Sequence, residues 1–191
     1  MIFRLFRGSP GTRTIDALYG AIVAQARNPA FYLGFEVPDT AEGRFDMIVL
    51  HLALLCRRLG REAGAGQARG QVLSQGVFDM FCRDMDHNLR EMGVGDLTVP
   101  KKMQKLAEAF YGRLEVYERA LVAAGDEELA AALARNVLGH AAADGTARRL
   151  ASYVRSVADR LDAESLAALS GGALSFPDPD AIPAPVREAQ P

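Results

Sequence analysis

Two carboxylates and an imidazole stand within four residues at Asp84-Met85-Asp86-His87, the one group of candidate metal ligands in the sequence. If this segment is helical, Asp84 and His87 lie one turn apart and could share a face, whereas Asp86 points elsewhere. A metal site needs further ligands on the same side, and no second cluster of acidic residues with histidine is present. We therefore interpret the segment as a solvated, ion-paired helix face. A metal-dependent enzyme using these three residues is the less favoured alternative.

The remaining reactive side chains do not form a catalytic pattern. Cys82 stands five residues from His87, a poor spacing for a nucleophile and its base on one helix, so we interpret Cys82 as a small packing residue. His51 and His140 lie in largely apolar stretches, where packing or surface roles are favoured over ligation of haem iron. No catalytic triad, phosphate-binding loop or haem-attachment motif is present. We predict a protein that is not an enzyme and carries no cofactor and no metal.

The segment from Leu73 to Arg113, which contains this acidic group, is predicted to be a helical hairpin. Apolar residues recur at steps of three and four on both sides of a corner, Gly93-Val94-Gly95-Asp96, whose glycines can close a helix. Thr98 and Pro100 follow, and an N-cap hydroxyl with an early proline favours the start of a second helix. The first stripe comprises Leu73, Val77, Phe78, Phe81, Met85, Leu89 and Met92, and the second comprises Met103, Leu106, Phe110, Leu114, Tyr117 and Leu121.

The second helix of the hairpin carries polar features that its own stability does not require. Lys101, Lys102 and Lys105 occupy its start, where the helix dipole disfavours cations, so they indicate an interaction surface, either within the hairpin or toward a partner. Gly112 inside a helix costs about 1 kcal/mol relative to alanine. It stands between Tyr111 and Arg113. A close approach of two helices of this chain would explain it, and so would the backbone of a partner.

Further helices are predicted around the hairpin, over residues 14–26, 43–59, 127–138 and 144–161, with 165–169 as an extension or separate turn. Thr14 is expected to be the N-cap of the first. The segment 43–59 is apolar on nearly every side, as expected for the central helix of a bundle. The aromatic segment 31–35 is expected to form a loop or single turn that packs its rings on the core, and 60–70 to form a flexible loop.

The predicted fold is all-α, a single helical bundle. From Ser170 onward glycine, proline and alanine dominate, which predicts an extended or disordered Pro-rich tail. The expected organisation is an N-terminal segment 1–13, a helical domain 14–169 and a tail 170–191. No strand alternation and no internal repeat are present.

Composition limits the function classes. The 191 residues are 49% hydrophobic with a net charge of -2, which argues against a specific nucleic-acid partner. Two cysteines inside helical patterns favour a reducing, cytoplasmic setting. The longest apolar run, residues 47–56, is too short for a spanning helix, which needs roughly 20 residues, so no transmembrane segment is expected. The aromatic and basic residues 3–7 could touch a membrane surface, although a frayed terminus is the favoured reading.

The chain resembles the ubiquinol–cytochrome c chaperone family, which includes mitochondrial complex III assembly factors and their alphaproteobacterial relatives. The residues that carry the resemblance are Ala24-Gln25-Ala26-Arg27-Asn28-Pro29-Ala30-Phe31-Tyr32, Gly43-Arg44-Phe45-Asp46-Met47, Phe81 through Asp96 and Phe110-Tyr111-Gly112-Arg113. The long acidic-basic stretch up to Asp96 is the most specific of these. The resemblance covers roughly residues 14–141.

The resemblance implies a non-enzymatic assembly factor for the cytochrome bc1 complex, built as a helical bundle. Family members bind newly made cytochrome b and hold it during haem acquisition and early assembly. The implied partners are therefore cytochrome b or another bc1 subunit, together with the ribosome or the inner-membrane surface. The implied location is cytoplasmic, at the cytoplasmic face of the inner membrane.

The hairpin is the expected client-binding surface, because apolar stripes rimmed by charges suit an amphipathic client segment. The candidate contacts are Asp84, Asp86, Arg90, Glu91, Asp96, Lys101, Lys102, Lys105, Tyr111 and Arg113. Two alternatives stay open. Several of these charges could pair with one another across the hairpin, and the chain could be a helical interaction scaffold whose partner is not a respiratory protein.

Overall fold

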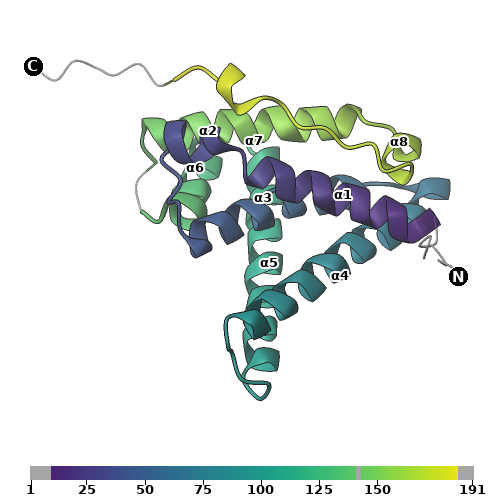
Figure 1. Ribbon diagram of the computed structural model, residues 1–191. Coiled ribbons are helices and arrows are strands. Elements are labelled where there is room, and N and C mark those ends of the chain that lie inside the picture. The colour runs from purple at the N-terminus through teal and green to yellow at the C-terminus, as the bar shows by residue number, and fades with distance from the viewer. Residues whose placement is uncertain (1–9, 141–142, 185–191) are drawn as a thin grey trace, which may run out of the picture.

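The computed structural model describes residues 10–140 and 143–184, and no strand occurs in these two ranges. Its α-helices are α1 (Pro10–Ala26), α2 (Pro29–Gly34), α3 (Ala41–Gly60), α4 (Gln67–Glu91), α5 (Val99–Val122), α6 (Glu127–Leu133), α7 (Gly145–Ala163) and α8 (Leu166–Ser170). Short 3-10 helices η1 (Gly64–Gly66) and η3 (Pro179–Ala181) and a π-helical turn η2 (Ala134–Leu138) complete the elements. The prediction of an all-α helical bundle is confirmed (Figure 1).

Helix α3 is the centre of the bundle, as its all-round apolar sequence predicts. Nearly every residue from Met47 to Leu59 is buried, and α3 contacts α1, α4, α5 and α7. Its start is fixed by Thr40, whose hydroxyl accepts a hydrogen bond from the amide of Gly43 at 3.1 Å. Gly43 is required there, since a Cβ would lie 2.0 Å from the carbonyl oxygen of Pro38.

Two expected helix starts are wrong. Helix α1 begins at Pro10, and Thr14 lies inside it as a buried residue whose hydroxyl donates to the carbonyl of Ser170 at 2.9 Å. Thr14 therefore holds the C-terminal region on α1 instead of capping the helix, and a local sequence pattern cannot show a hydrogen bond between residues so far apart in the chain. Helix α4 begins at Gln67, so most of the predicted loop 60–70 is taken up by the end of α3, by η1 and by the start of α4.

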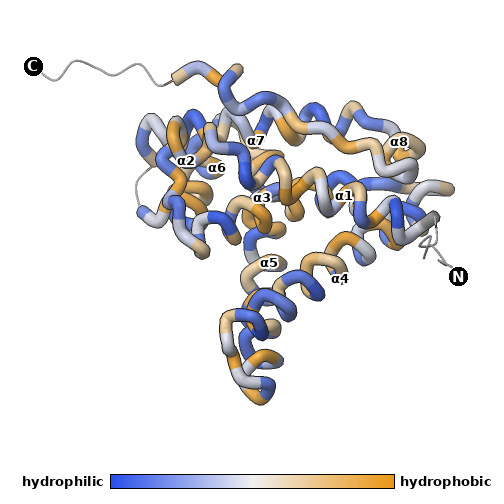
Figure 2. The backbone as a smooth tube through the Cα atoms, viewed as in Figure 1, coloured by the Kyte–Doolittle hydropathy of each residue, from blue (hydrophilic) through white to orange (hydrophobic). Residues whose placement is uncertain are grey.

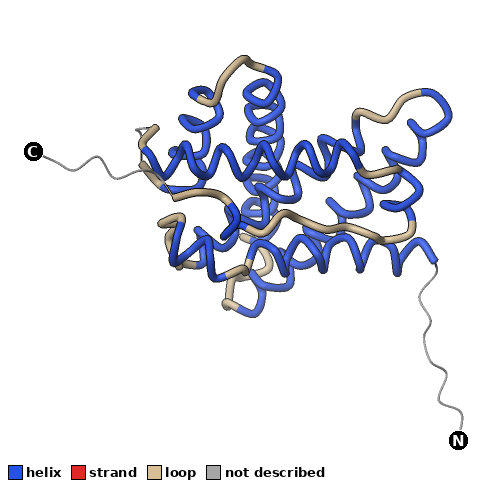
Figure 3. The backbone as a smooth tube through the Cα atoms, turned by 90° about the horizontal axis from the view of Figure 1, so that it is seen from above, coloured by secondary structure: helices blue, strands red, loops and turns tan. Residues whose placement is uncertain are grey.

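The C-terminal segment after α8 is extended over residues 173–178 and then forms the short 3-10 helix η3. After α8 it runs between α1 and α7 (Figure 3), where Gln25 donates to the carbonyl of Pro177 at 3.2 Å and Arg149 donates to that of Ile182. The ring of Phe176 meets that of buried His51 edge-on, with centroids 5.1 Å apart. This part of the tail therefore packs on the core. Residues 1–9 and 185–191, and with them the predicted membrane contact of residues 3–7, lie outside the described ranges, and the division into 1–13, 14–169 and 170–191 stays a prediction.

Helices α4 and α5 leave the rest of the bundle as a projecting hairpin (Figure 1). They contact each other and α3, and the hydropathy colouring shows apolar and hydrophilic residues side by side along the projection (Figure 2). No helix in the described ranges is long and apolar enough to cross a membrane.

Candidate functional site

The α4–α5 hairpin closes through a glycine turn at its far end. Gly93 has a φ of 79°, which favours glycine, and its amide donates to the carbonyl of Arg90 at 3.0 Å. The amide of Val94 donates to the carbonyl of Leu89 at 3.0 Å, so the last carbonyls of α4 are satisfied within the turn. Thr98 stands at the N-cap of α5, but its side chain makes no capping hydrogen bond, contrary to prediction.

Aromatic rings fasten the base of the hairpin to α3. The centroid of Phe78 lies 4.8 Å from that of Phe110 and 5.4 Å from that of Tyr111, which joins α4 to α5. Phe81 lies 6.0 Å from Phe45, which joins α4 to α3. Ring pairs at these separations add to the stabilisation from burial alone. The base of the hairpin is therefore rigidly placed, and it holds Tyr111 with its ring packed on one side and 54% exposed overall.

Arg113 of α5 lies in the same part of the hairpin, where it adjoins α3. Its guanidinium forms an ion pair with Asp46 of α3 at 2.7 Å and lies over the ring of Phe45 at 5.9 Å. Both partners of the ion pair are mostly buried, and burial raises the pKa of the Asp46 carboxyl despite the opposing effect of Arg113. Asp46, which the sequence analysis quoted only as part of the family resemblance, thus fixes α5 on α3, and Arg113 already has a partner within the chain.

The acidic group of α4 forms pairs within the chain. Arg90 bonds Asp86, one turn before it, at 2.7 Å and also bonds Asp96 across the glycine turn. His87 lies 3.1 Å from Glu91, one turn on. These contacts match the alternative in which hairpin charges pair with one another.

Asp84 faces the body of the protein rather than these pairs. Its carboxylate accepts a hydrogen bond of 2.7 Å from the hydroxyl of Tyr19 on α1. Burial, followed by this bond, raises the pKa of Tyr19 far above its ordinary value. Asp84 and His87 therefore have different partners, and no group of three potential metal ligands comes together in the described residues.

The start and outer face of α5 are open. Lys101, Lys102 and Lys105 are exposed, and none forms an ion pair within the part of the chain that the structure describes. Gly112 is exposed as well, and a Cβ built there would have no neighbour within 4 Å. Of the two explanations left open for Gly112, a close approach of two helices of this chain does not apply, because no other element in residues 10–140 and 143–184 covers that side of α5.

The histidine and cysteine side chains that were candidates for catalysis or metal binding are engaged in packing and in contacts within the protein. His51 is fully buried, with Nδ1 2.7 Å from the carbonyl of Met47 and Nε2 2.8 Å from the hydroxyl of Tyr153. Burial lowers its pKa to about 4. Burial also raises the pKa of Cys82, which favours the thiol over the nucleophilic thiolate. His140 lies partly exposed, 3.7 Å from Asp144.

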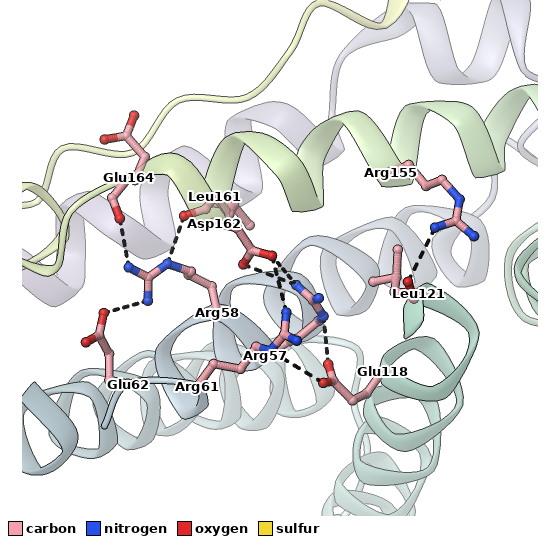
Figure 4. Close-up of polar contacts among 10 residues, drawn as sticks. All are labelled: Arg57, Arg58, Arg61, Glu62, Glu118, Leu121, Arg155, Leu161, Asp162 and Glu164. Atoms are coloured by element: carbon pink, nitrogen blue, oxygen red, sulfur yellow. Dashed lines mark hydrogen bonds and ion pairs between the residues drawn. The ribbon is translucent and has the colours of Figure 1, made fainter. Parts of the chain in front are cut away.

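The C-terminal end of α3 carries an arginine cluster, Arg57, Arg58 and Arg61, that the sequence analysis did not identify (Figure 4). Arg57 is buried and forms ion pairs with Glu118 of α5 at 2.6 Å and Asp162 of α7 at 3.3 Å. Arg58 donates to the carbonyl of Leu161 at 2.9 Å and to that of Glu164 at 2.8 Å, at the end of α7. The sequence signal for this cluster is the pair of adjacent arginines, Arg57 and Arg58, in the last turn of an otherwise apolar helix.

A family profile and individual relatives of known name point to the same family for this chain. The profile of the family described as "Ubiquinol-cytochrome C chaperone" matches residues 34–176. A Xenopus laevis protein named ubiquinol-cytochrome-c reductase complex assembly factor 1 is 27% identical over 153 residues, which cover 78% of this chain and 74% of that protein. The Homo sapiens protein of that name is 25% identical over 146 residues, which cover 76% of this chain but only 47% of the human protein.

The fold has also been seen in a solved relative. The crystal structure of the Cbp3 homolog from Brucella abortus superimposes with a TM-score of 0.79 and 41% sequence identity, covering 96% of this chain and 100% of the solved one. The profile match ends at residue 176, so the expected C-terminal limit of the resemblance near residue 141 was too short, and α7 and α8 are included. On these matches, the chain belongs to the ubiquinol-cytochrome C chaperone family.

Proposed function

We propose that this chain is a non-enzymatic assembly chaperone of the ubiquinol–cytochrome c reductase complex and that its α4–α5 hairpin holds newly made cytochrome b. Membership of a chaperone family, and relatives named as assembly factors of that complex, support the general role. Cytochrome b is the client that the family resemblance implies. The hairpin is the favoured binding element because it projects from the bundle (Figure 1).

The observation that carries the proposal is the open face of α5 at Tyr111 and Gly112. Tyr111 is held by Phe78 while half of its surface stays exposed, which makes it a rigid aromatic anchor of the kind that dominates binding energies. Gly112 leaves the helix backbone uncovered beside it, and no contact in the described part of the chain offsets the roughly 1 kcal/mol that a helical glycine costs. An apolar client segment could approach the backbone closely at that position.

The charged candidates would rim this anchor. Arg90 holds Asp86 and Asp96 in exposed pairs, which contribute little to stability and can be exchanged for client groups. Glu91 and the three lysines are exposed around the end of the hairpin. Asp84 and Arg113, by contrast, are bonded to Tyr19 and Asp46, so in this proposal they position α4 and α5 and contact the client only at their edges.

The proposed place of action follows from the client. Cytochrome b is an integral membrane protein, so the proposed location is cytoplasmic and peripheral at the inner-membrane surface, close to the ribosome that makes the client. The recognised parts of the client would be loops, termini or partly inserted helices.

Paired glycine substitutions test the α5 face. Gly112→Gln places a side chain where the client is proposed to lie, whereas Gly20→Gln adds the same side chain at an exposed glycine of α1 that also has no neighbour within 4 Å. Both variants are expected to fold, and only Gly112→Gln is expected to lose capture of cytochrome b from detergent-solubilised membranes. Equal capture by the two variants would remove this face from the proposal.

Deletion of the gene tests the role itself. Reduced-minus-oxidised spectra of membranes should lose the b-haem signal of the bc1 complex, and expression of the intact protein should restore it. Normal bc1 content in the deletion strain would contradict the assembly role.

A further inference from the structure

The far end of the hairpin combines exposed apolar side chains with lysines that form no ion pair within residues 10–140 and 143–184. Leu97 is 98% exposed and Met92 is 73% exposed, and both belong to the turn between α4 and α5. Lys101, Lys102 and Lys105 follow within the first two turns of α5. We call residues 92–105 the hairpin tip.

The lysines do not stabilise the hairpin itself. They stand at the positive end of the dipole of α5, which disfavours cations, and they form no ion pair in the described part of the chain. Asp96, the carboxylate within the tip, is already paired with Arg90, and Glu91, just before the tip, lies 3.1 Å from His87. Over residues 86–105, four cations stand against three carboxylates, in a chain whose net charge is -2. The tip is thus locally positive, and its unpaired charges are all cationic.

We propose that the hairpin tip docks on an anionic lipid bilayer, with Leu97 and Met92 entering the interface and the three lysines lying at the level of the headgroups. Apolar side chains beside cations are the combination that binds anionic membrane surfaces. The inference deepens the proposed function and rests on it for its setting, because a chaperone of a membrane protein would then approach its client from the bilayer surface.

The shape of the tip favours a bilayer over a protein. It is the convex end of a projection (Figure 1), where two large apolar side chains are exposed. A stable protein interface buries about 800 Å² on each partner around a packed core, which is more than such a tip offers. A bilayer requires no shaped partner, and weak binding through a few residues suits reversible attachment.

The chain contains no tryptophan, so one introduced at the tip becomes the sole tryptophan reporter. The test uses the full-length Leu97→Trp variant, with Val122→Trp, an exposed apolar site at the opposite end of α5, as its matched control. Vesicles of phosphatidylcholine mixed with phosphatidylglycerol should shift the emission of the first variant to the blue and leave that of the second unchanged. Vesicles of phosphatidylcholine alone should shift neither.

Vesicle co-sedimentation separates the tip from general electrostatic attraction. Replacing Lys101, Lys102 and Lys105 with glutamine should weaken binding by roughly fivefold per lysine. Leu97→Ser with Met92→Ser should weaken it by about tenfold or more. Glutamine at Arg13, Arg119 and Arg135, three exposed cations away from the tip, should leave most of the binding, and added salt should reduce it in the unmodified chain.

Three results would overturn the inference. These are absence of binding to the mixed vesicles, equal loss in the tip and control variants, and, in a separate arm without vesicles, a blue shift of Leu97→Trp on addition of detergent-solubilised cytochrome b when the vesicles alone produce none, which would make the tip a protein-binding site. The vesicle assay contains no client, and client capture is measured in detergent without a bilayer. Failure of the membrane contact can therefore be told apart from failure of the proposed function.

Discussion

Arginine–carboxylate pairs occur both in the body of the bundle and in the hairpin, but their surroundings differ. Arg57 is held between Glu118 and Asp162 with 6% of its side chain exposed (Figure 4). Arg90 is held between Asp86 and Asp96 with 46% of its side chain exposed. A buried pair leaves an uncompensated charge when one partner is removed, whereas an exposed pair is replaced by water at little cost.

This difference separates the parts of the molecule that maintain the fold from the part proposed to bind. The arginines at the end of α3 join it to α5 and α7, and their bonds end on carboxylates and backbone carbonyls of those helices. Arg90, near the far end of the hairpin, bonds its own helix and the adjoining turn, whereas Arg113, nearer α3, pairs with Asp46 as the arginines of the body pair with their partners. Arg57 therefore holds helices of the bundle together, whereas Arg90 can exchange its carboxylate partners for groups of a client.

The largest effect is expected at Arg57. Arg57→Met keeps the apolar stem but removes the charge between Glu118 and Asp162, and it should lower the free energy of unfolding by about 3 kcal/mol. Urea denaturation measures this. Arg61→Met is the matched control, because Arg61 pairs with the same two carboxylates but is half exposed, and it should lower the free energy by less than about 1 kcal/mol. Equal losses would show that burial does not distinguish the two arginines.

The second prediction concerns pH and His51. Its pKa in the folded chain, about 4, lies below the ordinary 6.5, so the unfolded chain binds the proton first as pH falls. The contribution of His51 to stability is complete above pH 6.5 and is lost toward pH 4, at up to about 1.4 kcal/mol per pH unit.

Comparison of variants isolates this effect, because the raised pKa of Asp46 acts with the opposite sign. Denaturation between pH 4 and 6.5 should show a smaller pH slope in His51→Gln than in the unmodified chain. His87→Gln, on the exposed face of α4, controls for the loss of a histidine. A slope unchanged by His51→Gln would mean that the buried imidazole is not the group that titrates.

A smaller loss is expected at Arg58. The planar guanidinium of Arg58 donates to the carbonyls of Leu161 and Glu164 and pairs with the carboxylate of Glu62 at 2.6 Å. The ammonium group of a lysine cannot make these three bonds at once. Arg58→Lys should lower the free energy of unfolding by about 1–2 kcal/mol. Hydrogen exchange should rise most at the C-terminal end of α7. Protection there equal to that of the unmodified chain would contradict the assigned role.

The smallest effect on stability is expected in the hairpin. Reversing Asp86 and Arg90 together, as Asp86→Arg with Arg90→Asp, should lower the midpoint of denaturation only slightly, because the carboxylate then placed opposite Asp96 is on an exposed surface. Capture of cytochrome b should nevertheless fall, since the client would meet reversed charges. Loss of stability without loss of capture would show that these hairpin charges maintain the fold and do not bind the client.

Local sequence patterns were sufficient for the fold. The steps of three and four around the Gly93 corner predicted the hairpin, and the all-round apolar segment ending at Leu59 predicted the central helix, because both signals lie within one element. The role of Thr14 could not be predicted, since its hydroxyl bonds Ser170, a residue 156 positions away. The ion pair of Arg113 with Asp46 was missed for the same reason, as its partners come from different helices.

The candidate site was only partly predictable. The charges of the hairpin were recognisable as a surface, but their pairing depends on how the turn brings Asp96 back to Arg90. The glycine signal at Gly112 was correctly noticed, and only the structure could choose between an internal neighbour and an open face. The exposure of Leu97 has no local signature, because whether a turn residue is covered depends on which other elements lie against it.

The central claim, that the hairpin rather than the body holds newly made cytochrome b, is tested most directly by site-specific photo-crosslinking. A photoreactive amino acid is placed at Tyr111 and, as control, at Ala24 on an exposed side of α1. Both proteins are expressed while cytochrome b is being made, and irradiated. The account predicts that cytochrome b is crosslinked from position 111 and not from position 24. Crosslinking from position 24 alone, or from neither while the deletion strain is fully complemented, would contradict it.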